Sequence, residues 1–348
     1  MNMKEVSIII PIYNVEKYVA ECLNSVISQT YDHSKIECII VDDCTPDRSM
    51  DIVNGIIENF KGEMTFVLHK HEHNQGLSAA RNSGMDIATG DYLYFMDSDD
   101  YIYPNAIELL MKTLRENPDS EIVSANTYDE NHNYNIFNIT GKRIIENINL
   151  LFAGNTKFLI AVNYLINRQF IKRIGVKFKR GIYFEDLLWN HQVLPLTSKV
   201  VIIPEIIYFY RKNTNSIIHQ AQAKKLNKSV FDHILILKSF IRELDNPIYV
   251  GKSVNILILY MITYDSILSN SHLIDKSEQM LHQMEILRGY LMLSHIKNKR
   301  YILSMMTLLI YSPFINLKKY GWYRHKFNRI IEPLWRLAIV FDRFHKIK

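Results

Sequence analysis

The first hundred residues alternate short apolar runs with amphipathic segments, and this alternation constrains the fold more than any other feature of the chain. Four runs rich in β-branched and aromatic residues cover residues 6–11, 37–41, 64–68 and 92–96. Between them, apolar residues recur at helical spacing, as at Cys22 and Val26. Strands that alternate with helices in this way predict an α/β fold with a parallel sheet and right-handed crossovers.

Acidic residues follow the second and the fourth of these runs. Asp42 ends one, and Asp97, Asp99 and Asp100 follow the other. Because open α/β sheets bind ligands at the carboxyl ends of their strands, we expect these carboxylates to lie in one site. Their mutual repulsion requires a compensating charge, which a divalent metal carrying a phosphate supplies. The alternative is a polar loop that caps a helix beginning near Pro104.

Four segments of this region follow one another in a fixed order: SIIIPIYN (7–14), IIVDD (39–43), NQGLSAARNSG (74–84) and YFMDSDD (94–100). In this order they resemble the successive motifs of family-two glycosyltransferases with the GT-A fold. The resemblance implies a Rossmann-like, mostly parallel sheet flanked by helices. It is strongest over residues 5–125 and continues through the segments 161–167 and 184–189 to about residue 216. One departure is Cys44, where many relatives have glycine, so we expect a turn made without glycine's freedom at positive φ.

An aromatic ring beside a carboxylate suits a nucleotide base, which offers a flat face and an edge of hydrogen-bonding groups. The resemblance implies that Tyr13 stacks on the base, usually uracil, and that Asp42 contacts its imide edge. Taken alone, the two residues fit better as a core tyrosine and a helix-capping aspartate. Arg81 falls in the first turns of a predicted helix, where an anionic nucleotide is favoured. The other residues expected at the nucleotide are Pro11, Asn14, Asp97 at the ribose, and Ser98.

The resemblance also implies a divalent metal at the aspartate cluster. Asp99 is the expected ligand, and Asp100 is the candidate for a second one. Carboxylate oxygens suit Mg²⁺ or Mn²⁺, and such a cation neutralises the leaving diphosphate. Some relatives add a histidine that follows the catalytic acids, and His219 occupies the corresponding place here.

A second acidic pair, Glu185 and Asp186, begins an amphipathic stretch that continues through Leu188 and Val193. The pair matches the family's acidic residues that supply the base for the acceptor hydroxyl. Asp186 is therefore the candidate general base, and Glu185 is the second choice. On position alone, the pair fits equally well as acids that complement a helix N-terminus.

Length and charge divide the chain further. A chain of 348 residues, 48% of them hydrophobic, has room for a catalytic domain over residues 1–217 and a mainly helical region over 218–348. We expect the nucleotide-sugar half in 1–125 and the acceptor half in 126–217. Residues 318–348 hold nine Lys or Arg against two acids, interleaved with aromatic side chains. This composition suits an anionic membrane surface, and nucleic acid would use the same charges. The apolar segment 301–315 just upstream, too short to span a membrane, favours the membrane surface, and a helix packed on its own domain is the alternative.

These features predict an inverting glycosyltransferase. By resemblance, it moves a sugar from a nucleotide-diphosphate sugar, most often a UDP-sugar, to a hydroxyl of a bacterial surface glycan such as capsule or lipopolysaccharide, or of a lipid-linked oligosaccharide. A dinucleotide-dependent oxidoreductase is disfavoured because residues 11–14 replace the Gly-x-Gly-x-x-Gly turn. A non-catalytic, membrane-associated nucleotide-sugar-binding protein with a decayed transferase domain is the alternative. Three cysteines without metal-motif spacing, and no cleavage pattern before Val6, predict a cytoplasmic protein at the inner face of the membrane.

Overall fold

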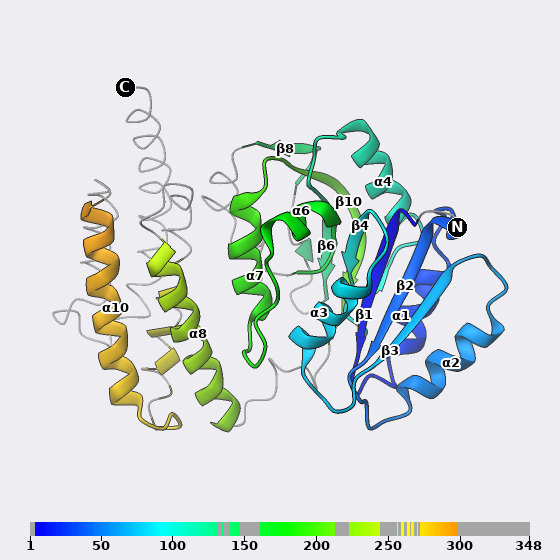
Figure 1. Cartoon of the computed structure of the whole chain (residues 1–348). Coiled ribbons are helices and arrows are strands. Elements are labelled where there is room, and N and C mark those ends of the chain that lie inside the picture. Colours follow the sequence, from blue (N-terminus) through cyan, green and yellow to red (C-terminus); the bar gives the residue numbers. More distant parts are fainter. Residues whose placement is uncertain are drawn as a thin grey trace. The chain divides into compact units, whose positions relative to one another are not determined.

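The computed structural model of the chain describes residues 4–130, 134–135, 139–146, 161–212, 223–243 and 272–297, together with residues 256, 259–260, 263–264, 266–267 and 270 (Figure 1). The chain forms two compact units. The first comprises Met1–Ile148 and Lys157–His219, and the second comprises Asn149–Thr156 and Gln220–Lys348. His219 and the basic segment 318–348 lie outside the described residues, so their roles stay predictions.

The first unit is built on a ten-stranded sheet. The strands are β1 Val6–Ile12, β2 Ile36–Asp42, β3 Thr65–Lys70, β4 Tyr92–Phe95, β5 Tyr101–Ile102, β6 Ile122–Asp129, β7 Tyr134–Asn135, β8 Arg143–Ile145, β9 Tyr164–Asn167 and β10 Val200–Tyr210. Their order is β3-β2-β1-β4-β9-β6-β10-β5, with β7 beside β6 and β8 beside β10. Strands β1 to β4 are parallel where they pair, β9 is antiparallel to β4 and β6, and β10 is parallel to β6.

Helices connect the parallel strands and cover the sheet. They are α1 Val19–Ile27, α2 Ser49–Asn59, α3 Leu77–Ile87, α4 Ala106–Glu116, α6 Arg168–Ile174 and α7 Glu185–Val193, with short 3-10 turns at His33–Lys35 and Leu194–Leu196. Helix α3 packs on β1 and β2, whereas α1 packs on α2 and β5 (Figure 1). Every residue of β1 and β2 is buried, as parallel strands covered on both faces require. The expected α/β fold with a mostly parallel sheet is confirmed.

The register of the strands brings their carboxyl ends to one edge. Ile12 at the end of β1 lies beside Asp42 of β2, and Ile9 lies beside Phe95 at the end of β4. The last part of β10 reaches the same region, because Tyr208 pairs with Ile102 of the short strand β5. The loop that follows β4 is therefore a neighbour of the end of β10.

Two long helices, α8 Ala223–Glu243 and α10 Ser277–Lys297, pack against each other in the second unit. Val230, Ile234 and Leu237 of α8 are buried and form an apolar face of this helix. Among the residues that the structure describes, no helix has the length and apolar character needed to cross a bilayer.

Candidate active site

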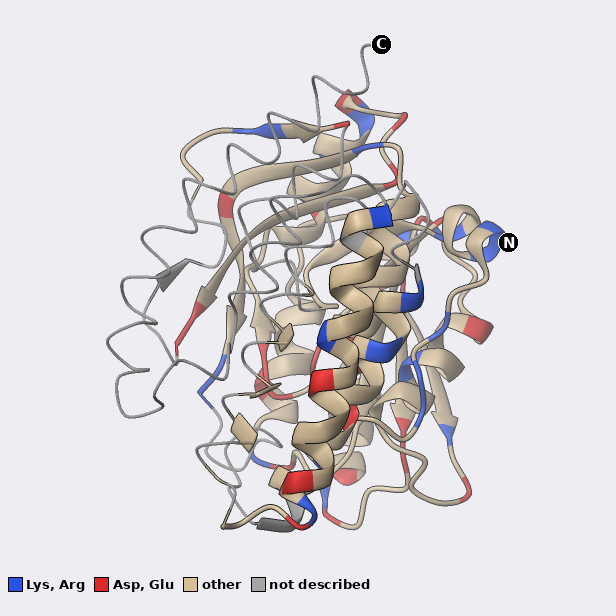
Figure 2. Ribbon diagram, turned by 90° about the vertical axis from the view of Figure 1, so that its left-hand side faces the viewer, with Lys and Arg blue, Asp and Glu red and all other residues tan. Residues whose placement is uncertain are grey.

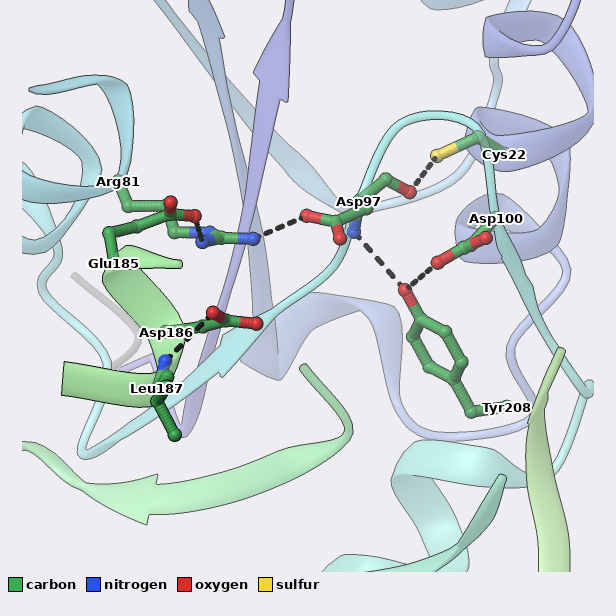
Figure 3. Close-up of polar contacts among 8 residues, drawn as sticks. All are labelled: Cys22, Arg81, Asp97, Asp100, Glu185, Asp186, Leu187 and Tyr208. Carbon is green, nitrogen blue, oxygen red and sulfur yellow. Dashed lines mark hydrogen bonds and ion pairs between the residues drawn. The ribbon is translucent and has the colours of Figure 1, made fainter. Parts of the chain in front are cut away.

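The loop after β4, residues 97–100, is fixed in place by the end of β10. Asp100 is 1% exposed, and its Oδ2 accepts a hydrogen bond from the Tyr208 hydroxyl at 2.7 Å. That hydroxyl also accepts from the backbone N–H of Asp97 at 3.2 Å, so one ring holds both ends of the loop (Figure 3). The backbone N–H of Arg211 donates a hydrogen bond to Oδ1 of Asp100 at 2.8 Å, and its Nε–H donates to the carbonyl of Asp99 at 2.8 Å.

Burial and the neighbouring acids raise the pKa of Asp100 well above its usual range. Both of its oxygens are already engaged by Tyr208 and Arg211. Asp100 thus supports the loop, and its role as a second metal ligand stays a prediction. Local sequence patterns do not point to Tyr208 or Arg211, because they lie more than a hundred residues from the loop that they support.

Arg81 joins the loop after β4 to helix α7. Its guanidinium is buried, with NH2 2.7 Å from Asp97 Oδ1 and NH1 2.8 Å from Glu185 Oε1 (Figure 3). The ring of Phe178 lies beneath it, 5.3 Å from the guanidinium carbon. Arg81 Nε is buried without a hydrogen-bond partner among the described residues. The structure thus brings two residues predicted at the nucleotide, Arg81 and Asp97, together with one member of the second acidic pair.

Asp186 lies beside Glu185 at the first turn of α7 and is turned toward the same space as Asp97 (Figure 3). Its Oδ1 accepts a hydrogen bond from the backbone N–H of Leu187 at 2.7 Å. Burial, followed by repulsion from Glu185, raises the pKa of Asp186 to about 7, although the charge of Arg81 acts in the opposite direction. A carboxylate with a pKa near the working pH is suited to take up a proton in a reaction.

The backbone before α7 is locally strained. Phe184, which precedes the helix, has φ of 60°, a left-handed conformation that non-glycine residues seldom adopt. Such conformations cost about 1–3 kcal/mol and are concentrated at functional sites. Here the bend sets the direction in which Glu185 and Asp186 enter the site.

The residues predicted at the base gather after β1 and β2. Tyr13 is 46% exposed, so a face of its ring is open to a ligand. Asp42 is buried, and its Oδ1 accepts from the backbone N–H of Thr45 at 2.8 Å. The backbone N–H of Asn14 donates to Thr45 Oγ1 at 2.8 Å, which ties the two loops together. The remaining predicted residues, Pro11 and Ser98, are both buried.

Asp43 holds the N-terminus of α3 and was not predicted at the site. Its Oδ1 accepts from the backbone N–H of Gln75 and its Oδ2 from that of Gly76, each at 2.8 Å. The His71 ring lies 2.7 Å from the same carboxylate. Gly76 has φ of 88°, which glycine adopts at little cost. Because Arg81 lies on α3, Asp43 and His71 fix the position of Arg81 indirectly. In the sequence, the acidic pair after β2 was the signal that could have pointed to Asp43.

The turn after β2 differs from the expectation for a chain without glycine there. Cys44 itself adopts the left-handed conformation, with φ of 57°. The turn is therefore the one that glycine would make. In cysteine this left-handed backbone conformation costs roughly 1–2 kcal/mol, because Cβ approaches the following carbonyl oxygen.

The carboxylates of the loop after β4 fit a metal ion that binds together with a phosphate group. Among the described residues, no cluster of three or more His, Cys, Asp or Glu is arranged to hold a metal. Mg²⁺ commonly uses one or two carboxylates, with substrate phosphates and water completing its coordination. Asp99 is half-buried in the loop, and Asp97 beside it keeps one oxygen on Arg81. These carboxylates suit a shared metal–diphosphate site better than a cation held by protein alone.

The model of the family described as glycosyl transferase family 2 matches residues 7–175 of this chain. Glycosyltransferase GlyG of Streptococcus pneumoniae serotype 4 is 34% identical over 223 residues, which are 61% of this chain and 72% of that relative. The chain belongs to glycosyltransferase family 2. As a member of this family it is an enzyme, and the non-catalytic alternative is set aside. The chain spans a smaller part of two further curated relatives, 62% and 31% of their lengths.

Solved structures show that this family 2 enzyme has the GT-A fold. S. aureus TarS residues 1–349, in complex with UDP-GlcNAc, matches with a TM-score of 0.57 and 17% identity, covering 85% of this chain and 92% of that one. The mannosyltransferase PcManGT from Pyrobaculum calidifontis, in complex with GDP-Man and Mn²⁺, matches with a TM-score of 0.53 and 15% identity, covering 85% and 87%. At these identities the likeness establishes the fold.

Proposed function

We propose that this family 2 glycosyltransferase transfers a sugar from a UDP-sugar to a hydroxyl of a growing glycan, with inversion at the anomeric carbon. One observation carries the proposal: Asp186, with a pKa raised to about 7, faces the space beside Asp97 of the nucleotide loop. Arg81 links the two through Glu185 and Asp97. These contacts support a single site in which Asp186 accepts the proton and the loop after β4 binds the nucleotide.

The proposed donor side lies at the carboxyl ends of β1, β2 and β4. The exposed ring of Tyr13 stacks on the base, and the carboxylate of Asp42 takes the imide edge of uracil. Asp97 contacts the ribose. The complex of TarS with UDP-GlcNAc supports a UDP-sugar as the donor. The complex of the mannosyltransferase with GDP-Man makes a GDP-sugar the alternative donor.

In the proposed mechanism, Asp186 accepts the proton of the acceptor hydroxyl as its oxygen attacks the anomeric carbon. Attack from the face opposite the diphosphate inverts the configuration in one displacement. Asp99 would hold Mg²⁺ or Mn²⁺, which supplies positive charge to the departing diphosphate when bound. Arg81 keeps Asp97 and Glu185 in place during the reaction, because its buried charge is compensated by both.

The proposed acceptor is a hydroxyl of a bacterial surface glycan or of a lipid-linked oligosaccharide. We place the enzyme at the inner face of the cytoplasmic membrane, since the basic, aromatic composition of residues 318–348 suits an anionic bilayer. In the same proposal, residues 1–217 form the catalytic domain and residues 218–348 a helical region.

A donor panel tests this function. Purified full-length protein is incubated with UDP-glucose, UDP-N-acetylglucosamine, UDP-galactose and GDP-mannose, with Mn²⁺ or with EDTA, and nucleotide release is measured. We expect release from a UDP-sugar only, with metal, and its loss in Asp186→Asn when a glycan acceptor is present. The anomeric configuration of the product, read by NMR, then reports inversion. Release from GDP-mannose alone, or a retained configuration, contradicts the proposal.

A further inference from the structure

Helix α10 is apolar on two faces, only one of which is covered. Met284, Leu287 and Leu291 are buried, and they form the face that packs inside the second unit. Ile286, Tyr290 and Leu293 form a second stripe at helical spacing, and they are 46%, 60% and 58% exposed. Large side chains of this kind, grouped on one exposed surface, mark an interaction site with a membrane or a protein.

A groove of 810 Å³ runs between α8 and α10 along this stripe, and we call it the α8–α10 groove. Ile286, Tyr290, Leu293 and Ile296 of α10 line it, together with Ile241 of α8. Its volume lies in the range of pockets that bury small ligands, and its walls are mainly apolar. The groove can therefore receive a hydrocarbon segment.

Among the described residues that line the groove, all the charged ones carry the same sign. They are Lys238 and Arg242 of α8 and Lys297 of α10. Lys238 Nζ donates to Gln283 Oε1 at 2.9 Å, so this cation lies where the two helices meet. In Figure 2, Lys and Arg positions (blue) lie on the upper and middle part of the helix in front, and Asp and Glu positions (red) lie in its lower half. The groove thus offers apolar walls and cations in one place.

We propose that the α8–α10 groove binds an anionic phospholipid at the surface of a bilayer. The acyl chain lies against Tyr290 and Leu293, and the headgroup phosphate lies at Lys238 and Arg242. Charge complementarity selects this occupant, because an apolar protein partner would offer no anion to Lys238 and Arg242. Apolar burial combined with attraction to anionic lipid is how helices bind at the membrane interface. No step of sugar transfer uses this groove, so the proposal stands apart from the catalytic assignment.

Vesicle binding by the full chain tests the proposal. Flotation with vesicles of phosphatidylglycerol and phosphatidylcholine is compared with flotation in pure phosphatidylcholine. We expect binding to the anionic vesicles only. The double variant Lys238→Gln/Arg242→Gln should bind about 25-fold more weakly, since each basic residue near the surface contributes roughly fivefold. The double variant Tyr290→Ser/Leu293→Ser should lose at least about tenfold, from lost apolar burial.

Two matched controls separate the groove from the rest of the surface. Phe231→Ser removes an apolar side chain of α8 that is 54% exposed and does not line the groove. Lys61→Gln removes an exposed cation of the first unit. Both should bind within about twofold of the wild type. Residues 318–348 are present in every variant, so their own attraction to lipid cancels in the comparison.

Three results would overturn the proposal. Equal flotation of the wild type and both groove variants would assign membrane binding, if any, to other residues. A lower melting temperature of Tyr290→Ser/Leu293→Ser without vesicles would show that the chain itself covers the groove. A smaller mass of that variant in light scattering would show that a second copy covers it.

Discussion

Replacing Asp186 with asparagine should impair the enzyme and stabilise it at the same time. Asparagine keeps the shape and the acceptor for the Leu187 N–H but takes up no proton. We expect single-turnover transfer to fall roughly 10²-fold to 10⁴-fold, the usual contribution of a general base. UDP affinity should barely change, because the proposed contact of Asp186 is with the acceptor.

The gain in stability follows from the raised pKa of Asp186, about 7 against 3.8 for an unperturbed aspartate. A folded pKa above the unfolded one means that the folded state holds the proton more tightly, so the wild type loses stability as pH rises from about 4 to about 7. Between pH 5 and pH 8 this amounts to about 3 kcal/mol at 1.36 kcal/mol per unit, which partial exposure reduces to roughly 1–2 kcal/mol. Asparagine removes this loss.

Urea unfolding of the wild type and of Asp186→Asn at pH 5 and at pH 8 measures the effect. The variant should gain roughly 1–2 kcal/mol on the wild type between the two pH values. Asp86→Asn is the matched control, because this carboxylate is exposed and pairs with Lys177 at the surface. It should show no such gain. If Asp186→Asn has the same stability relative to wild type at both pH values, the carboxylate is not destabilised in the folded state and the reasoning fails.

Three further outcomes are expected. Asp99→Ala, or EDTA added to the wild type, should abolish transfer with the fold intact by circular dichroism; full activity in EDTA would exclude the metal assignment. Tyr13→Ala should weaken UDP binding by roughly 1–3 kcal/mol in calorimetry, by analogy with bases stacked on aromatic rings, and equal wild-type affinity for UDP, GDP and ADP would refute a uridine site. Cys44→Gly should be tolerated and Cys44→Val should destabilise the fold by about 1 kcal/mol or more, since a β-branched residue fits φ of 57° poorly; similar melting temperatures for the two variants would argue against strain at this turn.

The sequence was sufficient for those parts of the fold in which local pattern and sheet topology agree. The β-branched run of β1 and the helical spacing of Cys22 and Val26 depend on neighbours in the chain, and the structure confirms both elements. The edge on which Asp42 and Asp97 gather follows from parallel pairing alone.

The residues that hold the site in place could not be predicted from local sequence patterns. Tyr208 and Arg211 reach the loop after β4 only because β10 pairs with β5 and β6, and sequence separation hides this contact. The left-handed Phe184 likewise depends on tertiary packing, since no glycine marks the bend. The resemblance supplied the identities of Arg81 and Asp186, and the structure supplied the ion pairs of Arg81 with Asp97 and Glu185.

Arg81 shares one positive charge between Asp97, on the donor side, and Glu185, beside the proposed base. A ligand that engages Asp97 changes how much of that charge is left for Glu185, and so changes the field at Asp186. By thermodynamic reciprocity, the protonation of Asp186 alters the affinity for that ligand by the same factor. Binding at Asp97 and the proton affinity of the proposed base are therefore linked through a single guanidinium, and each changes the other.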